Sequence, residues 1–210
     1  HKGQPIELTA EAKPLNDGTV HCRLLSERTL RTGRRQVTEH FTAHILLGMA
    51  PEIAPLPSAF FPDESYSPED IYQRFFHGPI FQVLTGVDSV SADALLANGQ
   101  VRHQHIANGL ISQPLVLEAA FQAAGLHHMI TRHEMALPSV IQEVQLIQNC
   151  KEDEELTITV NQNGKAYDVD VDAKSGPILR LRGFEMAVLG PLPPENRFPI
   201  PTEERPECIL

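Results

Sequence analysis

An acid and an amide interrupt the most apolar segment of the chain. This segment, QPLVLEAAFQAAGLHHMI at residues 113–130, carries Glu118 and Gln122. On a helix, positions i and i+4 share a face, so the two groups would stand side by side, followed by Gly125 and Met129. Apolar surroundings disfavour a charged carboxyl group and raise its pKa, which suits a proton donor. We predict general acid chemistry for Glu118, with Gln122 orienting the acid or holding a substrate oxygen.

A purely structural role for the same carboxyl group is the alternative. Glu118 could reach out through a gap in the surrounding sheet and pair with an arginine or a backbone group. Such pairing is how folded proteins usually accommodate a buried charge. The residues alone leave both interpretations open.

The helix that carries both residues is expected to touch sheet along most of its surface, because its apolar residues leave no polar face. Four strand-like runs follow it, at residues 139–149, 155–163, 165–173 and 177–189. Asn163-Gly164 and Ser175-Gly176 are typical of hairpin turns between them. The pattern predicts an α+β hot-dog fold, in which an antiparallel sheet wraps around a central apolar helix.

The residues before this helix divide into strands, a linker and a short helix. Alternation of apolar and polar residues predicts three antiparallel strands, at residues 6–13, 19–27 and 36–48. The proline-rich stretch from Pro51 permits neither a helix nor a central strand. Ser67 is a good N-cap for a helix that starts at Pro68 and runs to about Phe76. Further strands are expected near residues 82–91 and 99–106.

Three stretches together resemble a dehydratase domain of type I polyketide synthases, especially of the iterative and polyunsaturated fatty acid synthase kind. They are FFHGPIFQVL, PLVLEAAFQAAGL and LPSVIQEVQL, and the closing RLRGFEMAVLGPLP is similar to the final strand of such domains. In that family a Y-G-P-x-F-Q-like motif precedes a helix that bears D-x-x-x-Q or D-x-x-x-H, and the acid is catalytic. Residues 76–82, FHGPIFQ, fit the first motif. Glu118 and Gln122 take the acid and amide positions of the second.

The resemblance implies a double hot dog whose first half is incomplete. The expected parts are residues 1–50 as C-terminal strands of the first hot dog, 51–66 as a proline-rich linker, 67–190 as the second hot dog, and 191–210 as a proline-rich tail or linker. Because the chain begins at His1 without methionine, in a stretch that already looks like a strand, we expect it to be a fragment of a longer protein.

Two departures from the family pattern bear on activity. Glu118 stands where the family has aspartate, which is one methylene shorter. The family also takes the α-proton with a histidine in H-x-x-x-G-x-x-x-x-P of the first hot dog. His44 begins a partial match, but Ile53 occupies the proline position and HFTAHILLG alternates as a strand does. We therefore expect His44 on a strand and the catalytic histidine, if there is one, upstream of His1.

The reaction that the resemblance implies is loss of water from a 3-hydroxyacyl thioester held on the phosphopantetheine arm of an acyl carrier protein. A histidine would take the α-proton, Glu118 would protonate the departing hydroxyl group, and Gln122 would hold the hydroxyl or the acid in line. No metal or organic cofactor is implied. The expected partners are the acyl carrier protein and neighbouring synthase domains, and a homodimer is left open.

Residues of the F-H-G-P-I-F turn are the candidates for substrate binding. The family places this turn near its substrate tunnel, which implies a substrate-binding role for His77, Gly78, Pro79 and Phe81, although Gly78 and Pro79 most simply make the turn. Four phenylalanines could line an acyl tunnel or pack in the core, namely Phe75, Phe76, Phe81 and Phe121.

Two other functions remain open at this point. The first is a catalytically inactive relative of the same fold that serves as a scaffold, a dimerisation surface or a docking platform for the carrier protein. The second is a stand-alone hot-dog thioesterase, which the proline-rich linker between two hot-dog pieces disfavours.

Composition further narrows the classes of partner and site that the chain is expected to have. A formal net charge of -10 argues against nucleic acid as the main partner. No apolar run reaches the roughly 18 residues that span a bilayer, and no signal peptide is evident, so a cytoplasmic protein without a membrane partner is expected. The 3 cysteines are far apart and the 10 histidines lack the spacing of zinc sites, so neither disulfides nor a metal site is expected.

Overall fold

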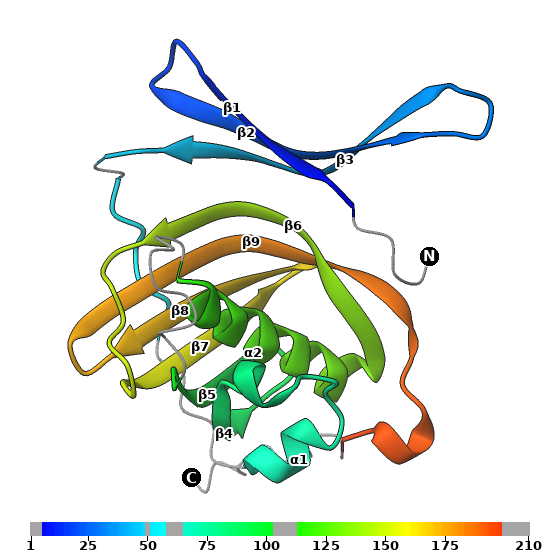
Figure 1. Cartoon of the computed structure of the whole chain (residues 1–210). Helices are drawn as coiled ribbons and strands as arrows, with labels where there is room; N and C mark the ends of the chain where they lie inside the picture. Colours follow the sequence, from blue (N-terminus) through cyan, green and yellow to red (C-terminus); the bar gives the residue numbers. More distant parts are fainter. Residues whose placement is uncertain (1–5, 49–50, 58–64, 103–112, 199–210) are drawn as a thin grey trace, which may run out of the picture. The chain divides into compact units, whose positions relative to one another are not determined.

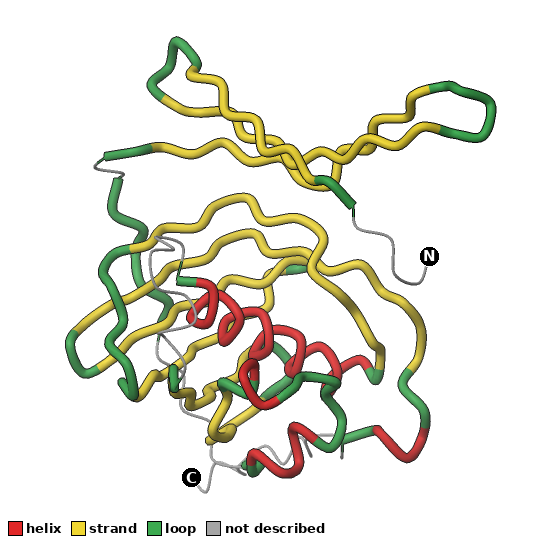
Figure 2. Tube along the Cα trace, viewed as in Figure 1, coloured by secondary structure: helices red, strands yellow, loops and turns green. Residues whose placement is uncertain are grey.

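The chain divides into two compact units. The structure, a computed structural model, describes residues 6–48, 51–57, 65–102 and 113–198. The first unit comprises residues 1–52 and the second comprises residues 53–210. Each unit contains one antiparallel sheet (Figures 1 and 2).

The first unit is a three-stranded sheet in the order β1-β2-β3. Its strands are β1 (Leu8–Pro14), β2 (Thr19–Thr29) and β3 (Arg35–Leu46). Gly18 and Gly33 have φ of +83° and +78° in the two connecting turns, a conformation that favours glycine. His44 lies on β3 opposite His21 of β2, which confirms it as a strand residue. The assignment of these strands to a first hot dog stays a prediction.

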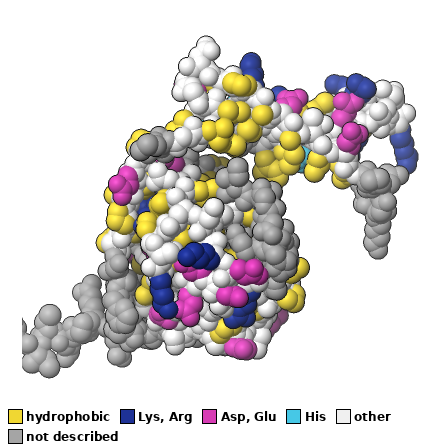
Figure 3. All heavy atoms as spheres, turned by 60° about the vertical axis from the view of Figure 1, so that its left-hand side comes forward, with side chains coloured by type: hydrophobic (Ala, Val, Ile, Leu, Met, Phe, Trp, Pro, Cys, Tyr) yellow, Lys and Arg dark blue, Asp and Glu magenta, His cyan; other side chains and the backbone are white. Residues whose placement is uncertain are grey.

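The surface of the first unit mixes charge with apolar side chains. Arg23 forms ion pairs with Glu39 at 2.6 Å and with Glu11 at 3.4 Å. Phe41 and Val37 of β3 are 71% and 58% exposed, and hydrophobic side chains gather on this sheet in Figure 3. On the face that Figure 3 shows, basic and acidic side chains are interspersed on both units, without an extended patch of one sign.

The second unit is built around one long helix, α2 (Pro114–Arg132). A six-stranded antiparallel sheet in the order β4-β5-β7-β8-β9-β6 curves around it (Figure 1). The strands are β4 (Leu84–Val90), β5 (Ala94–Gln100), β6 (Glu134–Leu146), β7 (Glu155–Asn163), β8 (Ala166–Ala173) and β9 (Gly176–Pro191). All six strands contact α2, which confirms the predicted hot-dog fold.

The core of this unit lies between α2 and the sheet. The alanines Ala119, Ala120, Ala123 and Ala124 are fully buried, so their small side chains let the strands approach the helix closely. The start of α2 is fixed by Gln113, whose side chain donates to the Gln148 carbonyl at 2.8 Å and accepts from the Cys150 N–H at 2.6 Å.

Two elements differ from the sequence-based expectation. The strand expected at residues 99–106 is β5, which ends at Gln100; residues 103–106 lie outside the described part of the chain. The first helix, α1 (Pro68–Tyr72), has the expected Ser67 cap but ends four residues before Phe76. The chain then turns and forms a short 3-10 helix, η1 (Pro79–Phe81), which gives the F-H-G-P-I-F segment its shape.

The segments on either side of the hot dog pack onto it. Residues 51–57 form neither helix nor strand, and the Leu56 N–H donates to Asp170 at 2.7 Å. After β9, Leu192 and Phe198 are each only 2% exposed on either side of η3 (Pro194–Asn196). Within the described residues, no helix is long and apolar enough to cross a membrane.

Candidate active site

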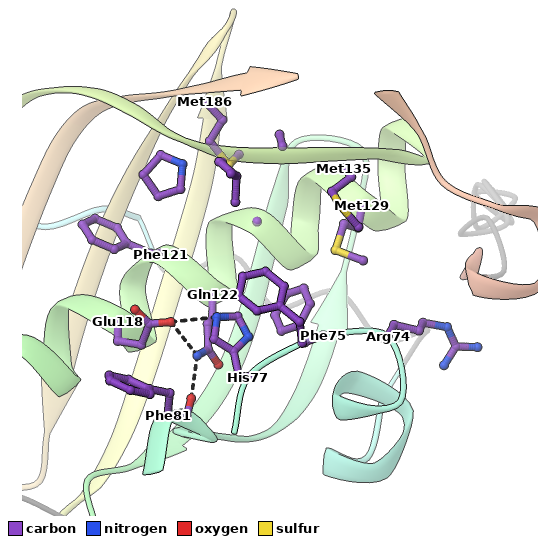
Figure 4. Close-up of a pocket in the computed structure, with 15 residues that line it drawn as sticks. Arg74, Phe75, His77, Phe81, Glu118, Phe121, Gln122, Met129, Met135 and Met186 are labelled. Atoms are coloured by element: carbon purple, nitrogen blue, oxygen red, sulfur yellow. Dashed lines mark hydrogen bonds and ion pairs between the residues drawn. The ribbon is translucent and has the colours of Figure 1, made fainter. Parts of the chain in front are cut away.

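A cavity of about 340 Å³ lies between α2, the F-H-G-P-I-F segment and strands β6 and β9 (Figure 4). Its walls are formed by Arg74, Phe75, Phe76, His77, Phe81, Glu118, Phe121, Gln122, Gly125, Met129, Met135, Ala136, Leu137, Pro138 and Met186. Most of these side chains are apolar, and the titratable ones are Arg74, His77 and Glu118. The cavity is therefore an apolar chamber in which Glu118, Gln122 and His77 lie together, apart from Arg74 (Figure 4).

One face of α2 supplies the helical wall of this cavity. Glu118, Gln122, Gly125 and Met129 all line it, as the i and i+4 spacing predicts. Gln122 is only 3% exposed, and 23% of the Glu118 side chain is exposed. The acid therefore reaches the cavity and the amide behind it is shielded from solvent.

The F-H-G-P-I-F segment supplies the opposite wall. Pro79 starts η1, and the Phe81 N–H donates to the Gly78 carbonyl at 2.9 Å, so the chain folds back at this point. The turn brings the His77 side chain and the Phe81 carbonyl to the cavity. Gly78 and Pro79 shape the turn and are not among the residues that line the cavity. All four phenylalanines named as tunnel candidates do line it.

Glu118 binds two donors through one oxygen. His77 Nε2 lies 3.0 Å from Oε1 of Glu118, and Gln122 Nε2 donates to the same oxygen at 2.8 Å. No described residue donates to Oε2. Within the described part of the chain, the alternative of an arginine partner for Glu118 is therefore not what the structure shows.

The pKa of Glu118 corrects one expectation from the sequence. Burial raises this pKa, but the hydrogen bonds from His77 and Gln122 and the charge on His77 together outweigh burial and lower the pKa below its ordinary value. The predicted upward shift was wrong because the apolar residues of the helix were visible in the sequence while the two donors converging on Oε1 were not. The carboxyl group is therefore ionised at neutral pH.

Gln122 joins Glu118 to two further groups. Its Nε2 donates to the Phe81 carbonyl at 2.6 Å, and its Oε1 accepts from the hydroxyl group of Tyr72 at 2.9 Å. The Tyr72 oxygen itself accepts from the Leu84 N–H at 2.7 Å. Tyr72 was not predicted from the sequence, because no spacing or motif connects α1 with the acid helix.

The His77 ring is held between aromatic rings. Its plane stacks on Phe76 at a centroid distance of 4.6 Å, and its edge meets Phe75 at 5.2 Å. Nδ1 of His77 is buried and has no hydrogen-bond partner among the described residues. The position of the ring is therefore set by Phe75, by Phe76 and by the contact of Nε2 with Glu118.

This arrangement places a carboxyl group and an imidazole side by side at the cavity. His77 Nε2 and Glu118 Oε1 lie 3.0 Å apart. A carboxyl group that lines an apolar cavity can exchange a proton with a bound molecule. In the described part of the chain, no group of three histidine, cysteine, aspartate or glutamate residues is placed to hold a metal ion.

Solved structures with the same fold are dehydratase domains of polyketide synthases. A trans-AT polyketide synthase dehydratase domain from Brevibacillus brevis is 21% identical, with a TM-score of 0.67 over 89% of this chain and 70% of the other. The dehydratase domain of RzxB from Pseudomonas fluorescens is 16% identical, with a TM-score of 0.63 over 86% and 68%. The dehydratase domain of PpsC from Mycobacterium tuberculosis is 21% identical, with a TM-score of 0.60 over 87% and 68%.

The sequence itself matches a family. No curated protein sequence matches the chain significantly. A family model described as the polyketide synthase dehydratase N-terminal domain matches residues 62–196, a range that contains the whole cavity described above. The chain therefore belongs to the polyketide synthase dehydratase family.

Proposed function

We propose that the second unit removes water from 3-hydroxyacyl thioesters that an acyl carrier protein holds on its phosphopantetheine arm. The observation that carries this proposal is the Glu118 carboxyl group, placed beside His77 and Gln122 in the wall of an apolar cavity. Membership of the dehydratase family supports the reaction class. A structure of the PpsC dehydratase domain, 22% identical, is described as a complex with C12:1-CoA, itself an acyl thioester.

Glu118 supplies the proton for the leaving hydroxyl group in this proposal. The protonated form of Glu118 is the donor, and the carboxyl group must take up this proton first, because hydrogen bonds from His77 and Gln122 lower its pKa. An acyl chain in the cavity excludes water and disfavours the carboxylate, so binding shifts the proton toward Glu118. The C–O bond breaks as Oε2 protonates the hydroxyl oxygen, and water leaves.

The α-proton goes to a histidine of the first hot dog, as the resemblance implies. One relative, a CurJ dehydratase that is 16% identical, is described as inactive when a histidine is replaced by phenylalanine, which supports the need for such a base. His77 then anchors the acid, and Phe81 contacts the acyl chain together with the methionines Met129, Met135 and Met186. Gly78 and Pro79 assist binding by holding His77 and Phe81 in place.

The setting of the reaction follows from the same proposal. Partners are the acyl carrier protein and neighbouring domains of a polyketide or polyunsaturated fatty acid synthase in the cytoplasm. The substrate stays attached to the phosphopantetheine arm, and the thioester acidifies the α-carbon without a further cofactor. In this proposal the chain divides into residues 1–50, 51–66, 67–190 and 191–210, and residues 67–190 form the second hot dog.

Replacement of the acid tests the proposal directly. Water loss from a 3-hydroxyacyl carrier substrate would be followed by mass spectrometry, using the parent protein that contains this chain. We expect Glu118→Gln to lower kcat about 100- to 10,000-fold, because it removes the proton donor and keeps the side-chain size.

A matched control is available in the same unit. Glu134 also pairs with a histidine, His128, at 3.3 Å, but does not line the cavity. Glu134→Gln is therefore expected to leave kcat nearly unchanged. Equal rates for the parent and Glu118→Gln would contradict the proposal. A parent that binds the loaded carrier protein without any water loss would favour the scaffold or docking function instead.

A further inference from the structure

We propose that Tyr72 is a positioning residue: its hydroxyl group fixes which way the Gln122 amide faces, and the amide in turn holds Glu118 as a carboxylate. The catalytic meaning of this inference rests on the proposed function, while its physical content concerns the protein without substrate. Tyr72 acts on Glu118 indirectly, because Tyr72 hydrogen-bonds Gln122 and Gln122 hydrogen-bonds Glu118.

The direction of the first hydrogen bond follows from the Leu84 backbone. A backbone N–H can only donate, so the Tyr72 oxygen must be the acceptor in the 2.7 Å contact with Leu84. The hydroxyl proton is then free for Gln122 Oε1 at 2.9 Å. Burial, with a smaller contribution from the charge on Glu118, raises the pKa of Tyr72 to about 12, so the hydroxyl group remains a donor throughout the neutral range.

The amide orientation follows from its three neighbours. An amide has one acceptor end and one donor end with two protons. With Oε1 held by Tyr72, the two N–H protons of Gln122 face two acceptors, the Phe81 carbonyl at 2.6 Å and Glu118 Oε1 at 2.8 Å. The reverse orientation would place Oε1 against two oxygens and NH2 against a hydroxyl oxygen that already accepts from the Leu84 N–H. At 3% exposure, Gln122 has little access to water that could replace these partners.

The groups that face Glu118 come from three elements. Gln122 donates from α2, His77 donates from the turn after α1, and Tyr72 acts through Gln122 from α1. Arg74 also lines the cavity, but its guanidinium donates to the Asp70 carbonyl at 2.7 Å and lies 4.5 Å above the Phe198 ring. Donation from the amide stabilises the charged carboxyl group, so an amide free to turn would stabilise it less.

A titration without substrate tests the inference. Carboxyl carbons of glutamate would be labelled with 13C in the 210-residue chain, and Glu118→Gln would identify the resonance of Glu118 in the NMR spectrum. Tyr72→Phe is expected to raise the pKa of Glu118, with about a fivefold change in its proton-dissociation constant, the size of one neutral hydrogen bond. Tyr167→Phe is the matched control, because Tyr167 is also buried and bonds His128 at 3.1 Å outside the cavity lining.

A double-mutant cycle shows whether Tyr72 acts through Gln122. Gln122→Met removes the amide and keeps the side-chain length, so it is expected to raise the pKa of Glu118 as well. In the Gln122→Met background, Tyr72→Phe should then add no further shift. A Tyr72→Phe shift of equal size in both backgrounds, or none in the parent chain, would overturn the inference. If the Tyr72→Phe variant does not fold, an unchanged pKa of Glu118 in Gln122→Met is enough by itself to overturn the inference.

The inference and the proposed function fail in different ways. The expected shifts in the pKa of Glu118 could be found although the parent protein never dehydrates a 3-hydroxyacyl carrier substrate. That result would support Tyr72 as the residue that orients Gln122 and would contradict the proposed reaction. If the parent protein dehydrates its substrate but Tyr72→Phe leaves the pKa of Glu118 unchanged, only the inference about Tyr72 is contradicted. Where both hold, Tyr72→Phe is expected to lower kcat several-fold with little change in KM and to move the pH profile of kcat in the direction of the NMR shift.

Discussion

Asp170 and Glu118 are two buried carboxyl groups of the same unit with very different surroundings. Asp170, on β8, has 3% of its side chain exposed and lies 2.7 Å from Arg182 and 3.3 Å from Arg180. The Leu56 N–H donates to it as well, at 2.7 Å. Glu118 has 23% of its side chain exposed, and its partners are a histidine and an amide that meet on one oxygen.

The difference separates a structural carboxylate from one able to do chemistry. Both oxygens of Asp170 are occupied, and two permanently charged arginines compensate its charge. It fastens residues 53–56 to the sheet, because Arg182 also donates to the Ala54 carbonyl at 2.8 Å. Glu118 lines the cavity, and among the described residues its donors meet on Oε1 alone. Position at a cavity, rather than burial, distinguishes Glu118 from Asp170.

Neutralising Asp170 should give the largest loss of stability in the unit. Asp170→Asn leaves Arg182 without its counter-charge and Arg180 with Asp172 alone, so the free energy of unfolding should fall by about 3 to 5 kcal/mol. Urea unfolding followed by circular dichroism measures this change. Glu118→Gln, measured in parallel, should lower the free energy of unfolding clearly less. The Glu118 carboxyl group is partly solvated, and its partners can rearrange toward the cavity. A larger stability loss for Glu118→Gln than for Asp170→Asn would reverse the roles assigned to the two carboxyl groups.

The sequence predicted the acid and its helix because both depend on local pattern. Glu118 and Gln122 lie on one face of α2, and the hairpin after β7 turns at Gly164 with φ of +64°, as Asn163-Gly164 indicates. The capping box of Ser67 and Asp70 at α1 is likewise a short-range feature. These elements needed no knowledge of distant partners.

The parts that sequence analysis missed depend on contacts between distant segments. Strand β5 contains Asn98 and Gly99, residues that are uncommon in strands. Gly99 suits its place because a Cβ there would lie 2.9 Å from the Val83 carbonyl, and that clash is invisible in the sequence. The direction of the Glu118 pKa shift and the role of Tyr72 depend in the same way on the turn that carries His77 and on α1.

A third buried titratable group, His127 on α2, sharpens the comparison, because its hydrogen-bond partner is the neutral Ser91 carbonyl at 3.1 Å. His127 is fully buried, and burial lowers its pKa to about 4. An unfolded histidine binds its proton below about pH 6.5, whereas the folded one stays neutral down to about pH 4. The unfolded chain therefore binds more protons in this window, and stability falls as pH decreases through it, by at most about 3 kcal/mol.

The measurement compares unfolding free energies at pH 7 and pH 4.5 for the parent and for His127→Gln. Other groups titrate in both chains, so the difference between the two changes in unfolding free energy isolates the contribution of His127. The parent is expected to lose more stability on acidification than the variant. Equal losses would show that His127 is not held neutral by burial.

An exposed ion pair provides the smallest expected effect and the baseline for the others. Lys174 lies 3.1 Å from Glu155, the same kind of distance as in the Asp170 cluster, but the two side chains are 88% and 72% exposed. Water and salt screen such a pair, so Lys174→Ala should change the free energy of unfolding by less than about 0.5 kcal/mol. Urea unfolding at low and high salt measures it. A loss comparable to that of Asp170→Asn would mean that ion-pair distance, and not the burial and complete pairing of the carboxylate, determines how much these charges stabilise the unit.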